Sequence, residues 1–209
     1  MKKRILVIEA CGNSDEPHEC NGICEQAQLY EIESVCKKVK DNKELEIILS
    51  SNGQFDYIYL SAHGCAESFA SEDKQVDMKW EEFASLLCKN HCINDDSILM
   101  LSCCRGGLMQ VAYTLFQCCS QICYVLGPRQ SLTSADMHIC FGIFMYNIEI
   151  RGIDPVVACE KIKNATDQRF SCYDREEEEM NLIVFLIFMT FITNCVHLMM
   201  IIYRRNKRR

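Results

Sequence analysis

The sequence predicts an α/β fold with a mainly parallel sheet. Short, nearly continuous apolar runs recur along the chain, and stretches of helical periodicity separate them. Runs of this kind are typical of strands that are buried on both faces of a parallel sheet. With 209 residues, the chain is long enough for one sizeable core and short for two. We therefore expect one domain built on one sheet.

Five apolar runs are the expected strands. Short connections of Asn, Asp, Gly and Ser follow several of them, as at Ser51-Asn52-Gly53. The runs are Ile5–Ala10, Leu45–Leu49, Tyr57–Ala62, Ile98–Ser102 and Ile122–Gly127.

Five helices are expected between and after these strands. The last is marked by Asp154 followed by Pro155, a favourable N-cap and first-turn pair. In the second expected helix, Trp80 and Phe83 begin an apolar stripe at helical spacing and are expected in the core. In the first helix, apolar residues recur at helical spacing at Leu29, Ile32, Val35, Cys36 and Val39. The expected helices are Gln26–Lys40, Lys79–Lys89, Leu108–Cys118, Ser134–Arg151 and Pro155–Ala165.

The charge and cysteine content narrow the class of protein. The formal net charge of −7 argues against nucleic acid as the main partner. The charge is distributed unevenly along the chain. Residues 1–179 hold all 29 acidic residues and 17 of the 22 basic ones, so that their net charge is −12. The 16 cysteines follow no export signal, since the first apolar run stops at Glu9. Reduced, mostly buried thiols are therefore expected.

The C-terminal part is expected to anchor the chain in a membrane. Residues 182–203 are 22 residues without Asp, Glu, Lys or Arg, long enough for a transmembrane helix. The expected organisation is a domain over 1–172, an acidic linker over 173–181, this helix as the contact with a lipid bilayer, and a basic tail over 204–209. The positive-inside rule places the tail in the cytoplasm. We expect the opposite single-pass topology, with the domain on the cytoplasmic side, because the domain is rich in thiols and has no export signal.

Two strand ends carry the candidate chemistry. The third expected strand runs into His63-Gly64, and the fourth runs into Cys103-Cys104-Arg105-Gly106. The carboxyl ends of parallel strands meet at one edge of a sheet, where ligands bind in open α/β folds. An imidazole beside a thiol can accept its proton and later protonate a leaving amine.

These residues resemble the caspase-like clan of cysteine proteases. Ser61-Ala62-His63-Gly64, followed 41 residues after the His by Cys104-Arg105-Gly106, is similar to the clan's His-Gly and Ala-Cys-Arg-Gly elements. Its CHAT branch is the most similar, because Leu101-Ser102-Cys103-Cys104 resembles that branch's Leu-Ser-x-Cys string. A later helix also carries similar spacings, at Asp136, Phe141, Tyr146 and Gly152.

The resemblance, which covers residues 4–166, implies a caspase-like three-layer αβα sandwich and a thiol protease. It implies Cys104 as nucleophile, His63 as general acid and base, and the backbone N–H groups of Gly64 and Cys104 as the oxyanion hole. Cys103 should be buried, because neighbouring side chains on a strand point to opposite faces. The implied enzyme cleaves a protein substrate through a thioacyl intermediate, is activated by a partner protein or ligand, and acts in cell death or defence. No cofactor is implied.

The substrate contacts are less defined. Asp136 matches a clan position near the pocket for the residue before the scissile bond and suggests a basic residue there, although an acid at a helix start is equally explained by the helix dipole. Arg105 matches the clan's Arg and is expected to position the loop or contact substrate.

Three other interpretations stay open. Zinc could be held by the loop that carries Cys11, His18, Cys20 and Cys24, although the spacing lacks paired Cys-x-x-Cys knuckles. A catalytically silent membrane adaptor could keep the same fold, and a metal-binding redox module would need exposed paired thiols.

Overall fold

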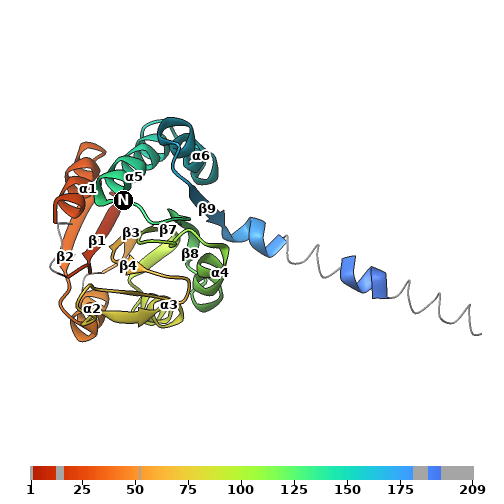
Figure 1. The fold of residues 1–209 in the computed structure, drawn as a ribbon, viewed down its shortest axis with the longest axis horizontal. Helices are drawn as coiled ribbons and strands as arrows, with labels where there is room; N and C mark the ends of the chain where they lie inside the picture. Colours follow the sequence, from red (N-terminus) through yellow and green to blue (C-terminus); the bar gives the residue numbers. More distant parts are fainter. Residues whose placement is uncertain (1, 13–16, 52, 181–187, 194–209) are drawn as a thin grey trace, which may run out of the picture. The chain divides into compact units, whose positions relative to one another are not determined.

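The computed structural model describes residues 2–12, 17–51, 53–180 and 188–193. The chain divides into two units, residues 1–174 and residues 175–209. Figure 1 shows the fold of the first unit. Within the second unit, residues 175–180 and 188–193 are helical, and Arg175 Nη1 lies 3.5 Å from Glu179 Oε1. Everything that positions the candidate site belongs to the first unit.

A six-stranded sheet, in the order β2-β1-β3-β7-β8-β9, forms the centre of the first unit. The neighbouring strands pair in parallel except at β9, which runs antiparallel to β8. The fold is therefore α/β with a mainly parallel sheet. The strands are β1 (Arg4–Glu9), β2 (Glu33–Lys38), β3 (Phe55–Ser61), β7 (Ile93–Ser102), β8 (Ile122–Pro128) and β9 (Phe170–Asp174).

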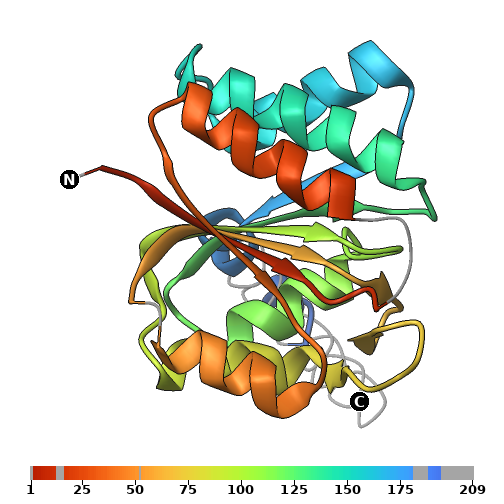
Figure 2. The same ribbon diagram turned by 90° about the vertical axis from the view of Figure 1, so that its left-hand side faces the viewer.

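Helices cover both faces of this sheet. Figure 2 shows helices packed on one face of the sheet and on the other, an arrangement compatible with a three-layer sandwich. Side chains of β1 point alternately to the two faces of the sheet. Ile5 and Val7 pack into one core cluster, and Leu6 and Ile8 pack into the other. The first face carries α1 (Pro17–Leu29), α5 (Ser134–Glu149) and α6 (Pro155–Thr166), and the second carries α2 (Asn42–Ser51), α3 (Trp80–Lys89) and α4 (Met109–Cys118).

A small antiparallel sheet follows β3 and was not expected from the sequence. It consists of β4 (His63–Gly64), β5 (Ser68–Ala70) and β6 (Asp77–Lys79). Phe69 of β5 packs against Trp80 and Phe83 of α3, with ring centroids 5.1 and 5.2 Å away. Both α3 aromatics are buried, as expected. This packing holds β4, and with it His63, to the body of the domain.

Four expected strands and four expected helices are confirmed, with ends that shift by two residues at most except at β7, which begins at Ile93 and not at Ile98, and two elements were wrong. The helix expected over Gln26–Lys40 is the end of α1 followed by the edge strand β2, with Glu31 in the left-handed region (φ 60°) at the turn between them. The strand expected over Leu45–Leu49 belongs to α2. A capping pair starts α2, since Glu44 N–H donates to Asp41 Oδ1 at 2.8 Å and Lys40 N–H to Glu44 Oε2 at 2.8 Å.

The expected transmembrane helix needs correction. In the part of the chain that the structure describes, no helix is long and apolar enough to cross a membrane. Of the expected span over 182–203, only the helical residues 188–193 are described, and the others lie outside the described residues, as does the basic tail over 204–209. The finding overturns the membrane helix in the expected fold class and the single-pass membrane localisation that depended on it.

Candidate active site

The two predicted catalytic side chains follow strands that are paired in register. Ser61, the last residue of β3, pairs with Ser102, the last residue of β7. His63 and Cys104 each come two residues later, and the Ala62 N–H continues the pairing by donating to the Ser102 carbonyl at 3.2 Å. The parallel register therefore delivers the imidazole and the thiol to the same edge of the sheet.

The His-Gly segment lies directly against the cysteine segment. A Cβ atom added to Gly64 would stand 2.8 Å from Cys103 Cβ and 2.9 Å from the Cys104 carbonyl oxygen. Only a residue without a side chain permits this approach without displacement of the backbone. The backbone groups of Gly64 and Cys104, the predicted oxyanion hole, thus belong to two segments in close contact.

The two adjacent cysteines have different surroundings. Cys103 is 1% exposed and belongs to the core cluster under α2, α3 and α4. Cys104 is only partly buried, and His63 is exposed. The alternation of side chains along β7 explains the difference, because Ser102 and Leu101 already face opposite layers. Of the two thiols, Cys104 is the one that solvent and a substrate can reach.

A tight turn after Cys104 leads into α4. The Gly106 N–H donates to the Cys103 carbonyl at 2.9 Å, and Arg105 adopts the left-handed conformation (φ 65°). A Cβ atom on Gly107 would stand 1.9 Å from the Gly127 carbonyl oxygen, so this glycine lets the turn pack on the end of β8. Arg105 is exposed on this turn. A non-glycine residue in this region of φ is uncommon and is often found at functional turns.

A buried carboxylate lies beside this edge and was not predicted from the sequence. Glu19, in the first turn of α1, is 5% exposed. Its Oε1 accepts hydrogen bonds from the Tyr59 hydroxyl and from the Ser102 hydroxyl, both at 2.5 Å. Burial and the charge of Glu19 raise the pKa of Tyr59 well above its usual range, so the phenol stays protonated and donates. Ser102 connects this carboxylate to the strand that carries Cys104.

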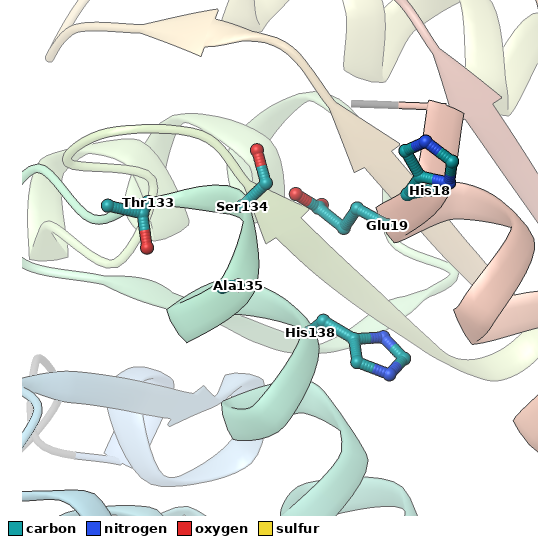
Figure 3. Close-up of a pocket in the computed structure, with 6 residues that line it drawn as sticks. All are labelled: His18, Glu19, Thr133, Ser134, Ala135 and His138. Atoms are coloured by element: carbon teal, nitrogen blue, oxygen red, sulfur yellow. The ribbon is translucent and has the colours of Figure 1, made fainter. Parts of the chain in front are cut away.

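Glu19 also lines a cavity of about 410 Å³ between the starts of α1 and α5. Figure 3 shows Glu19 extending from α1 and Ser134 from the first turn of α5. Among the described residues, His138 Nδ1 is buried and has no hydrogen-bond partner. The cavity is lined by His18, Glu19, Thr133, Ser134, Ala135 and His138. Such a hollow, with one buried charge and few polar groups, is a common form of ligand site.

Asp136, the acid predicted to select a basic substrate residue, caps α5. Thr133 Oγ1 accepts from the Asp136 N–H at 3.2 Å and donates to Asp136 Oδ2 at 2.7 Å. The Gln168 Nε2 donates to Asp136 Oδ1 at 3.5 Å. One carboxylate oxygen therefore caps the start of α5, and the other ties it to the segment between α6 and β9.

The residues of the candidate zinc cluster are distributed among different contacts. Cys11 Sγ lies 3.3 Å from Ser61 Oγ, whereas Cys20 is buried and its pKa is raised by that burial. Cys24 hydrogen-bonds to Cys36 of β2, which lowers the pKa of Cys36 to about 7 and, with burial, raises that of Cys24. In the ranges that the structure describes, no three or more His, Cys, Asp or Glu side chains are placed to hold a metal ion.

Comparison with known proteins provides no family for this chain, so a functional assignment rests on the residues described above. No protein-family model matches the chain, and a search of curated proteins finds no significant match.

Proposed function

We propose that the chain is a cysteine endopeptidase in which Cys104 is the nucleophile and His63 the general acid and base. The observation that carries this proposal is the close contact between the His63-Gly64 segment and the Cys103-Cys104 segment at the carboxyl edge of the sheet. Solvent access to Cys104 and His63, beside a buried and inaccessible Cys103, supports the same assignment.

The proposed reaction follows from these groups. His63 accepts the proton of the Cys104 thiol, and the thiolate forms a bond to the carbonyl carbon of the scissile peptide. The backbone N–H groups of Gly64 and Cys104 stabilise the oxyanion. When the C–N bond breaks, His63 gives its proton to the leaving amine. Water, deprotonated by His63, then hydrolyses the thioester and restores the thiol.

The cavity that Glu19 lines supplies a preference for substrates with a Lys or Arg side chain. Its buried carboxylate hydrogen-bonds to Ser102, two residues before Cys104 on the same strand. A basic side chain in this cavity would place its aliphatic part among the lining residues and its charge near Glu19. The net charge of −12 over residues 1–179 favours basic substrates in the same sense. We assign this role to Glu19 in preference to Asp136, whose carboxylate caps α5.

Activation by a partner protein or ligand, and a role in cell death or defence, stay predictions from the resemblance.

Hydrolysis of a fluorogenic peptide library tests the proposal. Wild type should cleave after Lys or Arg, and Cys104→Ala and His63→Ala should lose at least 1,000-fold in kcat/KM, because an acylation step without its nucleophile or base loses several orders of magnitude. Cys103→Ala and His91→Ala are the matched controls, since Cys103 is buried and His91 is exposed on the turn between α3 and β7. Full activity in Cys104→Ala, or no cleavage of any peptide by folded wild type, would contradict the proposal.

A further inference from the structure

A second cavity, of about 600 Å³, lies at the junction of β8, β9 and α6. It shares no lining residue with the cavity at Glu19. Its volume is within the range of small-molecule sites, roughly 300–1,000 Å³. Three of its seven lining residues are cationic and none is a carboxylate. The seven lining residues are Leu108, Arg129, Gln130, Lys163, Arg169, Phe170 and Ser171.

The fold gathers the three cations from two segments. Arg129 follows β8 and Arg169 precedes β9, and the antiparallel pairing of these strands joins them, with the Arg129 N–H donating to the Arg169 carbonyl at 2.8 Å. Lys163 comes from the last turn of α6. Asp167, in the left-handed region at φ 58°, then ends the helix and turns the chain towards Arg169. Their positions are thus determined by regular hydrogen-bonded structure.

The charge of this cavity differs from that of the rest of the domain. Residues 1–179 have a net charge of −12, yet this cavity has three positive side chains. Among the described residues, no ion pair engages Arg129, Lys163 or Arg169. Cations that surround one hollow repel each other, and an anion between them removes that repulsion. These side chains are exposed, and it is their gathering around one hollow of an acidic domain, with no carboxylate in the lining, that indicates a site for an anionic ligand.

We propose that this cavity binds a small ligand that carries phosphate groups. Two arginines can each donate paired hydrogen bonds to phosphate oxygens, and the lysine adds a third charge. Three cations match a ligand with two or more negative charges, such as a diphosphate group, better than a single carboxylate. Leu108, at the start of α4, also places the helix N-terminus at the cavity wall.

The ligand would be held next to the turn that carries Cys104. The Leu108 N–H donates to the Arg105 carbonyl at 3.2 Å, and the Gly107 N–H donates to the Pro128 carbonyl at 2.9 Å. From β9, the Tyr173 hydroxyl donates to the Gly107 carbonyl at 3.2 Å. Binding would therefore stabilise the contacts between this turn and the ends of β8 and β9. The proposal does not depend on peptidase activity.

Calorimetric titration of the full chain with inorganic pyrophosphate tests the proposal. We expect one site, with affinity that falls as salt is raised. Arg129→Gln, Arg169→Gln and Lys163→Gln should each weaken binding about tenfold or more, because each removes charge-assisted hydrogen bonds. Lys161→Gln is the matched control, since it makes the same charge change two residues away on α6, outside the cavity. It should change affinity less than twofold, and Cys104→Ala should bind as wild type does.

Circular dichroism and thermal melts are used to check that each variant folds. Pyrophosphate should raise the Tm of wild type but not that of the double variant Arg129→Gln/Arg169→Gln. Absence of pyrophosphate binding at millimolar concentration by folded wild type would overturn the proposal. Equal weakening by Lys161→Gln and Lys163→Gln would overturn it too, because it would show attraction to general surface charge. A third overturning result is binding of a peptide with acidic side chains, lost in the same variants, in place of pyrophosphate.

Discussion

Replacement of Gly64 by alanine tests the contact on which the candidate site depends. The added Cβ would stand 2.8 Å from Cys103 Cβ and 2.9 Å from the Cys104 carbonyl oxygen, where ordinary contacts begin at 3.4 Å. The two segments must therefore separate by about 0.5 Å or more, a shift that strains a packed site by roughly 1–3 kcal/mol. The φ angle of Gly64 is not in the left-handed region, so the cost is steric.

Two readouts follow from this separation. Thermal melts should show a Tm lower by about 2–4 °C for each kcal/mol in a domain of this size. Steady-state hydrolysis of a Lys peptide should show kcat lower by at least tenfold, because a displacement of about 1 Å between reacting groups can cost roughly 100-fold.

Gly142→Ala is the matched control for this variant. Its Cβ would meet the far end of the Gln26 side chain, with Nε2 at 3.1 Å, and a shift of a few tenths of an ångström relieves this contact while the amide keeps its hydrogen bonds to the Tyr30 hydroxyl and the Gly142 carbonyl. Alanine also favours the interior of α5 by up to about 1 kcal/mol. Stability and kcat should thus stay near those of wild type. A Gly64→Ala protein with kcat within twofold of wild type would refute the close contact between the His63 and Cys104 segments.

Three further outcomes are expected. Glu19→Gln should lower kcat/KM for Lys and Arg peptides about tenfold or more while leaving peptides with a neutral residue at that position unchanged; an equal loss on both would contradict the role of its charge. Tyr59→Phe removes a hydrogen bond to the buried Glu19 carboxylate and should lower the free energy of unfolding by about 1–3 kcal/mol in urea titrations, with no change expected if that bond is absent. The thiolate fraction of Cys36 rises as pH passes through its lowered pKa of about 7, so site-resolved alkylation should be half-maximal near pH 7. Cys24→Ala should move that midpoint up towards about 8.5, the usual thiol value, and an unmoved midpoint would contradict the hydrogen bond between the two thiols.

Much of the sheet could be predicted from the sequence because its central strands are buried on both faces. The strands β1, β3 and β8, and the part of β7 over residues 98–101, are apolar nearly throughout, and burial of both faces requires this. The edge strand β2 has exposed Lys and Glu positions, and its apolar residues also fit a helical stripe. In α2, Leu45, Ile48 and Leu49 are buried at helical spacing, yet five residues are too few to separate this pattern from a strand.

The candidate site was predictable only where it depends on strand order. Parallel strands bring His63 and Cys104 to one edge, and the alternation along β7 predicts the burial of Cys103. The cavity at Glu19 depends on a contact with Ser102, 83 residues away in the chain, that no local pattern records. One signal could have pointed to it, since Glu19 lies in the loop and helix start that follow the first strand, at the same edge of the sheet. The basic cavity likewise needs β9, which was not among the expected strands.

Covalent labelling with a peptidyl electrophile that ends in Lys tests the central claim most directly. Intact-mass and peptide mass spectrometry should place one adduct on Cys104 in wild type and in Cys103→Ala. The adduct should be absent from Cys104→Ala and should form much more slowly in His63→Ala, because the thiol then lacks its base. Unchanged labelling of Cys104→Ala, with the adduct on another cysteine, would contradict the assignment of Cys104 as the nucleophile.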